Sequence, residues 1–125
     1  MTRMLCLLVV GLAVSNCSGT NPTEAVAYAA ATGGNPQRGR AAIVDRNCGA
    51  CHTIPGVREA QGKVGPPLFW WSRRGLIAGE VPNTPANLVQ WVRNPQSIEP
   101  NTAMPALGLS DGEARDVAAY LFTLR

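Results

Sequence analysis

The sequence is poor in several residue types, and each scarcity excludes a class of function. Its 125 residues contain one histidine, His52, and one lysine, Lys63. The net charge is only +3, and the basic residues are scattered among eight acids instead of forming a stripe. We therefore exclude nucleic acid as a partner, because proteins that bind it need a concentrated basic surface. The length allows one domain of ordinary size.

The longest apolar run lies at the N-terminus and predicts an export signal. Arg3 precedes it, and it covers residues 4–14. Eleven helical residues span about half of a ~30 Å hydrocarbon core, which is the length of a signal-peptide core and too short for a transmembrane helix. Small residues then precede Cys17, as in bacterial lipoprotein signals whose cysteine is lipidated, and simple cleavage after Ser15 is the alternative. We expect residues 1–17 to form a signal peptide, and the protein to be exported to the periplasm, either soluble or tethered by a lipid on Cys17.

Residues 18–34 are small, polar and rich in alanine, and they end in Gly33 and Gly34. This composition predicts a flexible tether with an r.m.s. reach of roughly 20–25 Å. A short helix over residues 24–31 is the alternative, although nothing in the sequence requires it to pack. The compact domain is expected at residues 35–125.

Three start signals predict three helices in this domain. The signals are Asn35 before Pro36, Thr84 before Pro85, and the capping box formed by Ser110 with Glu113. The first helix should run to about Arg46, and the second should end at Asn94 because Pro95 follows it. No stretch alternates as a strand would. We predict an all-α domain of about 90 residues, with long loops and a core so small that it needs a covalent or cofactor staple.

The stretch Cys48–Gly–Ala–Cys51–His52 is the attachment signature of c-type haem. Two cysteines three positions apart lie on one side of a helical turn, so both thiols can reach the vinyl groups of one porphyrin edge. His52 then directs a ring nitrogen at the iron. A covalently attached haem c would also supply the missing core.

Other interpretations of the two cysteines are weaker. A zinc site needs about four ligands, and the expected mature chain offers no further histidine or cysteine. A thioredoxin-like redox pair belongs in a βαβ context, which the sequence does not show. A chance match in a structural turn is the third alternative.

Haem iron has two axial positions, and the second ligand must be something other than histidine. Met104 is the one methionine that remains after removal of a signal peptide. It lies in a loop with prolines at positions 95, 100 and 105, which limit the conformations of the chain. We predict His52 and Met104 as the iron ligands. Lys63, Tyr120 and water are the alternatives.

Five motifs in order resemble the class I cytochromes c, and specifically small exported monohaem cytochromes of bacterial respiratory chains. The motifs are CGACH, GPPL at residues 65–68, LVQWVRNP, TAMP and ARDVAAYL. The resemblance covers residues 36–125. It implies the cytochrome c fold, in which N- and C-terminal helices cross in an α-helical shell around haem. It also implies that Gly39 and Ile43 meet Val117, Tyr120 and Leu121.

The resemblance further implies roles around the haem. The carbonyl of Pro66 would accept a hydrogen bond from His52, a contact that fixes the tautomer of a ligating histidine. Leu68, Leu88 and Trp91 would pack on the haem, and plain core packing is the alternative for these three.

Charged and aromatic residues follow the GPPL motif. Arg74 lies where the family often has an arginine near a haem propionate, with Arg73 or a solvated arginine as the alternatives. Phe69, Trp70 and Trp71 would form an apolar rim near the haem or fill the shell. Because lysines are nearly absent, a lysine-ringed docking face is not expected.

Ligation by both His52 and Met104 would leave the iron no open position, so single-electron transfer is the expected function. We expect a monohaem carrier in a bacterial respiratory chain that passes electrons towards a terminal oxidase or reductase. Its partners would be the donor complex and that oxidase or reductase, docking transiently, and the haem maturation machinery. The alternative is a haem subunit of a periplasmic enzyme, either the electron-acceptor subunit of a dehydrogenase or a peroxidase-like site.

Overall fold

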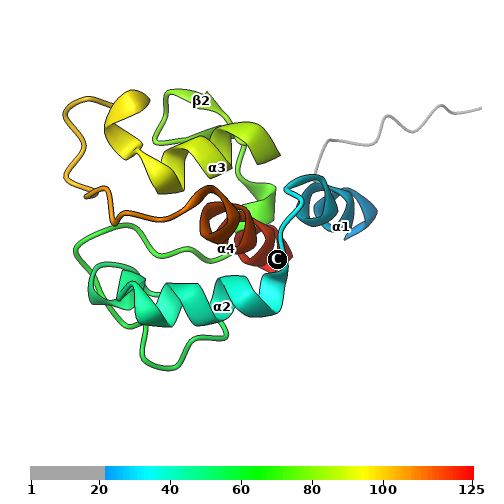
Figure 1. Ribbon diagram of the computed structural model, residues 1–125, viewed down its shortest axis with the longest axis horizontal. Coiled ribbons are helices and arrows are strands. Elements are labelled where there is room, and N and C mark those ends of the chain that lie inside the picture. The colour runs from blue at the N-terminus through cyan, green and yellow to red at the C-terminus, as the bar shows by residue number, and fades with distance from the viewer. Residues whose placement is uncertain (1–21) are drawn as a thin grey trace, which may run out of the picture.

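The computed structural model describes residues 22–125, and within them it contains four α-helices, three 3-10 turns and one short two-stranded ribbon (Figure 1). The elements in chain order are α1 (Pro22–Ala31), α2 (Pro36–Asp45), η1 (Cys48–Ala50), η2 (Trp71–Arg73), β1 (Leu76–Ile77), β2 (Val81–Pro82), α3 (Pro85–Arg93), η3 (Pro95–Ser97) and α4 (Asp111–Thr123). No helix of this described part is both long and apolar enough to cross a bilayer. The expected signal peptide and Cys17 lie outside the described residues.

The three predicted helices are confirmed as α2, α3 and α4. Asn35 accepts a hydrogen bond from Arg38 N at 2.9 Å and so caps α2. Thr84 caps α3, which ends at Asn94 before the proline. Ser110 and Glu113 form the predicted capping box of α4. Each start satisfies backbone N–H groups that have no partner inside the helix.

The crossing of α2 and α4 forms the centre of the domain, and the expected all-α shell is confirmed. Figure 1 shows α4 between α2 on one side and α3 on the other. A Cβ atom on Gly39 would lie 1.9 Å from the carbonyl oxygen of Asp116 and 3.0 Å from Val117 N. Only glycine permits so close an approach of two backbones. Ile43 and Leu121 belong to the buried cluster beside this crossing.

The predicted tether is wrong from residue 22 onward, because α1 is a helix packed against α4 (Figure 1). Ala25 and Ala29, one turn apart, are buried. Tyr28 meets Phe122 edge to face, with ring centroids 5.3 Å apart and planes at 86°. Alanine is the best helix former, and its small side chain lets two helices approach closely. The composition that indicated flexibility therefore forms a packing face.

Substitution Tyr28→Ala tests whether α1 contributes to stability. We expect the free energy of unfolding to fall by about 1–2 kcal/mol, because the edge-to-face contact and part of the buried ring area are lost. Thermal or denaturant unfolding measures the change. The control is Val26→Ala in the same helix, whose side chain is 60% exposed and should change stability by less than about 0.5 kcal/mol. Equal stability of the two variants would argue that α1 does not stabilise the domain.

The two-stranded ribbon is a feature that the sequence did not indicate. Residues 76 and 77 pair with 82 and 81. The turn between them has positive φ at Ala78 (53°) and Gly79 (81°), and Glu80 N donates to Ile77 O at 2.9 Å. Positive φ at both central residues is typical of a type I′ hairpin turn. Strands of two residues are too short to display alternation, so no pattern could have predicted them.

Candidate functional site

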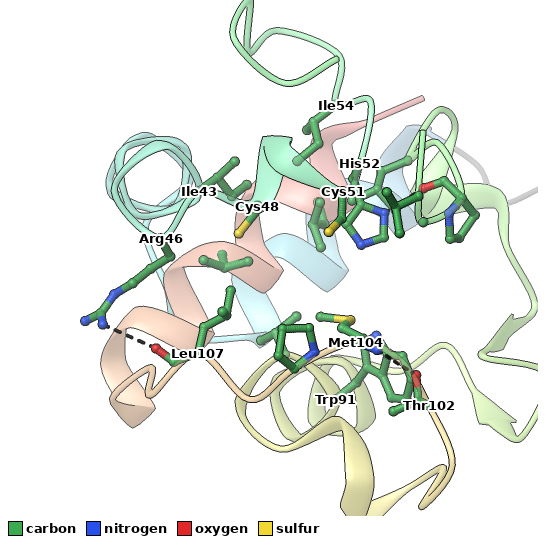
Figure 2. A pocket seen from close by; sticks show the side chains of 18 of the residues that line it. Ile43, Arg46, Cys48, Cys51, His52, Ile54, Trp91, Thr102, Met104 and Leu107 are labelled. Carbon is green, nitrogen blue, oxygen red and sulfur yellow. Dashed lines mark hydrogen bonds between the residues drawn. The ribbon is translucent and has the colours of Figure 1, made fainter. Parts of the chain in front are cut away.

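A cavity of about 580 Å³ opens between the cysteine motif and the loop that follows α3. Its volume falls within the range of about 300–1,000 Å³ found for small-molecule sites. Most of its walls are apolar side chains. The predicted site residues that line it are Cys48, Cys51, His52, Pro66, Leu68, Arg74, Trp91 and Met104. Figure 2 shows Cys48, Cys51 and His52 on one side of the cavity, with Trp91 and Met104 on the other.

Leu88 is the one predicted haem contact that does not line the cavity. Its side chain is fully buried, but in the helical core beneath α3. Trp91, one turn further along α3, reaches the cavity. The assignment of Leu88 to the haem is therefore corrected to core packing, which the sequence had left as the alternative. Both residues lie on the buried face of α3. The helical period alone does not say which of them packs on other helices and which one reaches the cavity.

The two thiols point into the cavity because the chain turns tightly between them. Cys51 N donates to Cys48 O at 3.2 Å, and His52 N donates to the same oxygen at 3.1 Å. Both cysteines are free, without a disulfide. Burial raises the pKa of the Cys48 thiol, so it is neutral at pH 7 and adds no charge to an apolar wall.

The imidazole of His52 is fixed from two sides. Its Nδ1 lies 2.7 Å from the carbonyl oxygen of Pro66. A carbonyl only accepts hydrogen bonds, so Nδ1 carries a proton, and in the neutral imidazole Nε2 is then the nitrogen with the free lone pair. A Cβ on Gly65 would lie 2.5 Å from His52 Cε1, so the ring packs closely against a residue that has no side chain. This is the arrangement that orients a metal-ligating histidine.

Met104, the predicted second ligand, lines the cavity. Lys63 and Tyr120 are not among the lining residues. The hydroxyl of Tyr120 donates to Pro55 O at 2.6 Å and is therefore engaged elsewhere. Figure 2 shows Met104 across the cavity from His52. The two side chains are thus placed to approach one planar group from opposite faces.

Two side chains with hydrogen-bond donors, Arg74 and Trp71, lie side by side at the cavity. Arg74 is half-buried, its guanidinium lies 4.9 Å from the ring centroid of Trp71, and its hydrogen bonds go to the carbonyls of Pro67 and Phe69. Burial lowers the pKa of Arg74. Trp71 Nε1 is buried and has no hydrogen-bond partner within the described residues. An anionic group at this end of the cavity would give the guanidinium of Arg74 a counter-charge. Arg73 is exposed and does not line the cavity.

The three adjacent aromatic residues have different positions. Trp71 is buried and lines the cavity, whereas Phe69 and Trp70 are exposed and do not. The sequence treated the three alike and missed the unpartnered indole nitrogen of Trp71. The one available signal was its spacing from Arg74, since residues three apart in a 3-10 turn lie on one side.

The residues present fit a haem c. The cavity offers two thiols three positions apart, an imidazole nitrogen, a thioether opposite to it, and apolar walls. A buried donor without a partner costs free energy, and the two acidic side chains of a haem would supply an acceptor for Trp71 Nε1 and a counter-charge for Arg74.

Known proteins match this chain over most of its length. Residues 34–121 match the family described as cytochrome C oxidase, cbb3-type, subunit III. Cytochrome c oxidase subunit 2 of Alkalihalophilus pseudofirmus is 31% identical over 105 residues, which is 83% of this chain and 27% of that protein. The proteins of the same name from Bacillus sp. strain PS3 and Bacillus subtilis are 30% and 28% identical over 67% and 71% of this chain. The chain spans about a quarter of the length of these relatives.

Proposed function

Because the chain belongs to the c-type cytochromes of the cbb3 oxidase subunit III family and carries covalently bound haem c, we propose that it is a monohaem electron carrier of a respiratory chain. One observation carries the proposal. The cavity has an imidazole on one side and a thioether on the other, so the chain offers two side chains that would ligate the haem iron. With both bound, no substrate would reach the iron. Electron transfer is then the function that the site supports best.

The roles of the individual residues follow from the geometry. Cys48 and Cys51 would form the two thioether bonds, and His52 would ligate through Nε2 while Pro66 holds Nδ1. Met104 would supply the second ligand. When bound, the haem supplies one iron that takes up and releases a single electron. The Met/His ligand pair raises the reduction potential, and apolar walls such as Leu68 disfavour the extra charge of the oxidised state.

Trp71 and Arg74 are proposed to hold the haem propionates. Both donors lie at the cavity, and within the described residues neither faces an acidic side chain. A propionate would accept from Trp71 Nε1 and form a charge-assisted bond with the guanidinium of Arg74. Arg74 is favoured over Arg73 because only Arg74 reaches the cavity.

Electrons would pass at the edge where the cavity meets the surface. Val64 and Leu76 line the cavity and are 83% and 53% exposed. Such an apolar edge suits the small, brief docking of redox partners. The relatives are oxidase subunits, which supports a terminal oxidase as the electron acceptor. A donor complex and the haem maturation machinery are the other proposed partners, and a terminal reductase is the alternative acceptor.

The proposed location is the periplasm, with Cys17 as the site of a lipid anchor. The support is the apolar run of residues 4–14 followed by small residues before Cys17. Covalent haem attachment by maturation machinery is consistent with an exported chain.

A second candidate is a haem subunit that stays bound within an enzyme complex. It is favoured by the fact that the matching domain makes up about a quarter of an oxidase subunit in the relatives. Stable co-purification with a large catalytic chain would support it over a diffusing carrier.

Substitution Met104→Ala tests the proposed electron carrier. We expect haem to remain attached through Cys48 and Cys51, while ferric iron binds cyanide or imidazole far more tightly and the reduction potential falls. Ligand titration and redox titration of the holoprotein measure these changes. Lys63→Ala and Tyr120→Phe are controls that should bind external ligands as wild type does. Wild-type spectra and ligand affinity in Met104→Ala would contradict the ligand assignment.

A further inference from the structure

The segment that carries Met104 is held in place without hydrogen bonds between backbone groups. In the described chain, residues 103–109 neither donate nor accept a backbone–backbone hydrogen bond. The turn before them is closed by one, from Thr102 N to Glu99 O at 3.1 Å. Met104 itself is only half-buried, although Leu109 further along is buried. The position of the Met104 side chain therefore depends on a few side-chain contacts.

Three side chains hydrogen-bond to the backbone of this segment. Thr102 Oγ1 accepts from Met104 N at 3.2 Å, but Thr102 belongs to the same loop and moves with it. Arg46 Nη1 donates to Leu107 O at a long 3.4 Å. Gln96 Nε2 donates to the carbonyl oxygen of Met104 at 2.8 Å. Among the described residues, Gln96 is thus the one side chain that ties the Met104 peptide to another element by a hydrogen bond.

The backbone that carries Gln96 is well anchored. It lies in η3, whose first residue, Pro95, is fully buried. Ile98 N donates to Pro95 O at 3.0 Å, so the turn is closed by its own backbone. The turn follows directly on α3, which packs against α4. The side chain of Gln96 is exposed, yet its backbone is anchored to the core.

The far end of the segment is contacted by Arg46, whose guanidinium is itself held in an ion pair. Arg46 Nη2 lies 2.6 Å from Glu113 Oε1, and Glu113 Oε2 accepts from Ser110 N at 2.9 Å. Arg46, followed by Ser110, lowers the pKa of Glu113 to about 2, so the pair is charged at neutral pH. Figure 2 shows Arg46 beside the carbonyl of Leu107 at one edge of the cavity. Arg46 thus contacts the segment three residues beyond Met104, whereas Gln96 contacts the Met104 peptide itself.

We propose that Gln96 is the positioning residue for Met104: its amide holds the Met104 carbonyl and thereby keeps the thioether directed into the cavity. This inference rests on the proposed function, because it takes Met104 as an axial ligand. Gln96 does not line the cavity, so it acts through Met104 alone. The hydrogen bond from Gln96 raises the fraction of molecules in which the Met104 thioether points into the cavity.

Imidazole added to the oxidised holoprotein reports that fraction. It can occupy the sixth position only in molecules whose Met104 is displaced. Its apparent dissociation constant is therefore the intrinsic constant divided by the open fraction. Loss of one hydrogen bond of ordinary net strength changes such an equilibrium about two- to tenfold.

The experiment compares imidazole binding by wild type, Gln96→Leu and Gln96→Glu. Leucine removes the donor, whereas glutamate keeps the shape and turns an acceptor towards the Met104 carbonyl. We expect the affinity for imidazole to rise about two- to tenfold in Gln96→Leu and further in Gln96→Glu. The charge-transfer absorption of thioether-ligated ferric iron should weaken in the same order. Wild-type affinity in both variants would overturn the inference.

Gln90→Leu is the matched control. Gln90 Nε2 donates to Ser97 Oγ in the same turn at 3.1 Å and does not touch Met104. If this variant binds imidazole as tightly as Gln96→Leu, the cause is general loosening of η3 and the specific role is overturned. Met104→Ala separates the two proposals. If it binds imidazole as wild type does, the ligand assignment fails and the inference fails with it, whereas tight binding with unchanged Gln96 variants overturns the inference alone.

Discussion

Replacement of both Cys48 and Cys51 by serine is expected to abolish covalent haem and, with it, stable folding of the domain. Both thiols line the cavity, and serine forms no thioether. The cavity opens to the surface, so without haem its apolar walls would be exposed to water instead of buried. Each apolar side chain left exposed forgoes about 1.5–3 kcal/mol of burial, and whole domains are stable by only about 5–15 kcal/mol. The haem-free chain is therefore expected to be unfolded or close to unfolding.

Mass spectrometry of the purified chain checks this result. The double variant, made with the haem maturation machinery, should lack the mass of haem, and acidified solvent should extract any haem that remains bound. The same spectrum would show the added mass of a lipid on Cys17. Cys51→Ser alone keeps one thioether through Cys48 and serves as the matched control. Covalent haem in the double variant would mean that attachment uses other residues.

The three main helices could be predicted because their signals are local. Asn35, Thr84 and Ser110 each cap a helix by accepting from a backbone N–H three residues later. Such a contact is encoded within four residues, and it forms whatever the rest of the chain does. The cysteine motif is local in the same way, since its turn is closed between Cys48 and His52.

Residues whose role depends on distant contacts could not be assigned from the sequence. Leu88 and Trp91 share the buried face of α3, yet only Trp91 reaches the cavity. Trp71 differs from its aromatic neighbours because η2 turns it inward. In each case the position of the side chain depends on which distant element packs against it. A periodic sequence pattern does not contain that information.

The packing of α1, a helix that the sequence offered only as the alternative to a tether, and the contact of Gln96 were missed for the same physical reason. A run of alanines has equal composition in a mobile tether and in a packed helix. What distinguishes the two here is Phe122, which meets Tyr28 from α4. Gln96 bonds a carbonyl eight positions away, across a loop without regular structure. Contacts of a polar side chain with an irregular backbone leave no pattern in the sequence.

Substitution Gly39→Ala is expected to lower the free energy of unfolding by about 3 kcal/mol or more. The new Cβ would lie 1.9 Å from the carbonyl oxygen of Asp116, an atom of the α4 backbone that cannot rotate away as a side chain would. The helices must therefore separate. Because α2 ends three residues before Cys48, its displacement should also move the thiols and lower the yield of covalent haem. Denaturant unfolding of the holoprotein and the haem content per chain measure the two effects.

Gly112→Ala is the matched control for this prediction. Gly112 lies in α4, and a Cβ there meets no heavy atom within 4 Å. Since alanine is the better helix former, this variant should equal wild type or exceed it by up to about 1 kcal/mol. Both substitutions add the same methyl group to a helix. The difference in stability between the two variants therefore measures the steric effect at the crossing of α2 and α4, apart from the effect of helix propensity. If Gly39→Ala is as stable as Gly112→Ala, the contact between α2 and α4 does not limit the packing around the haem cavity.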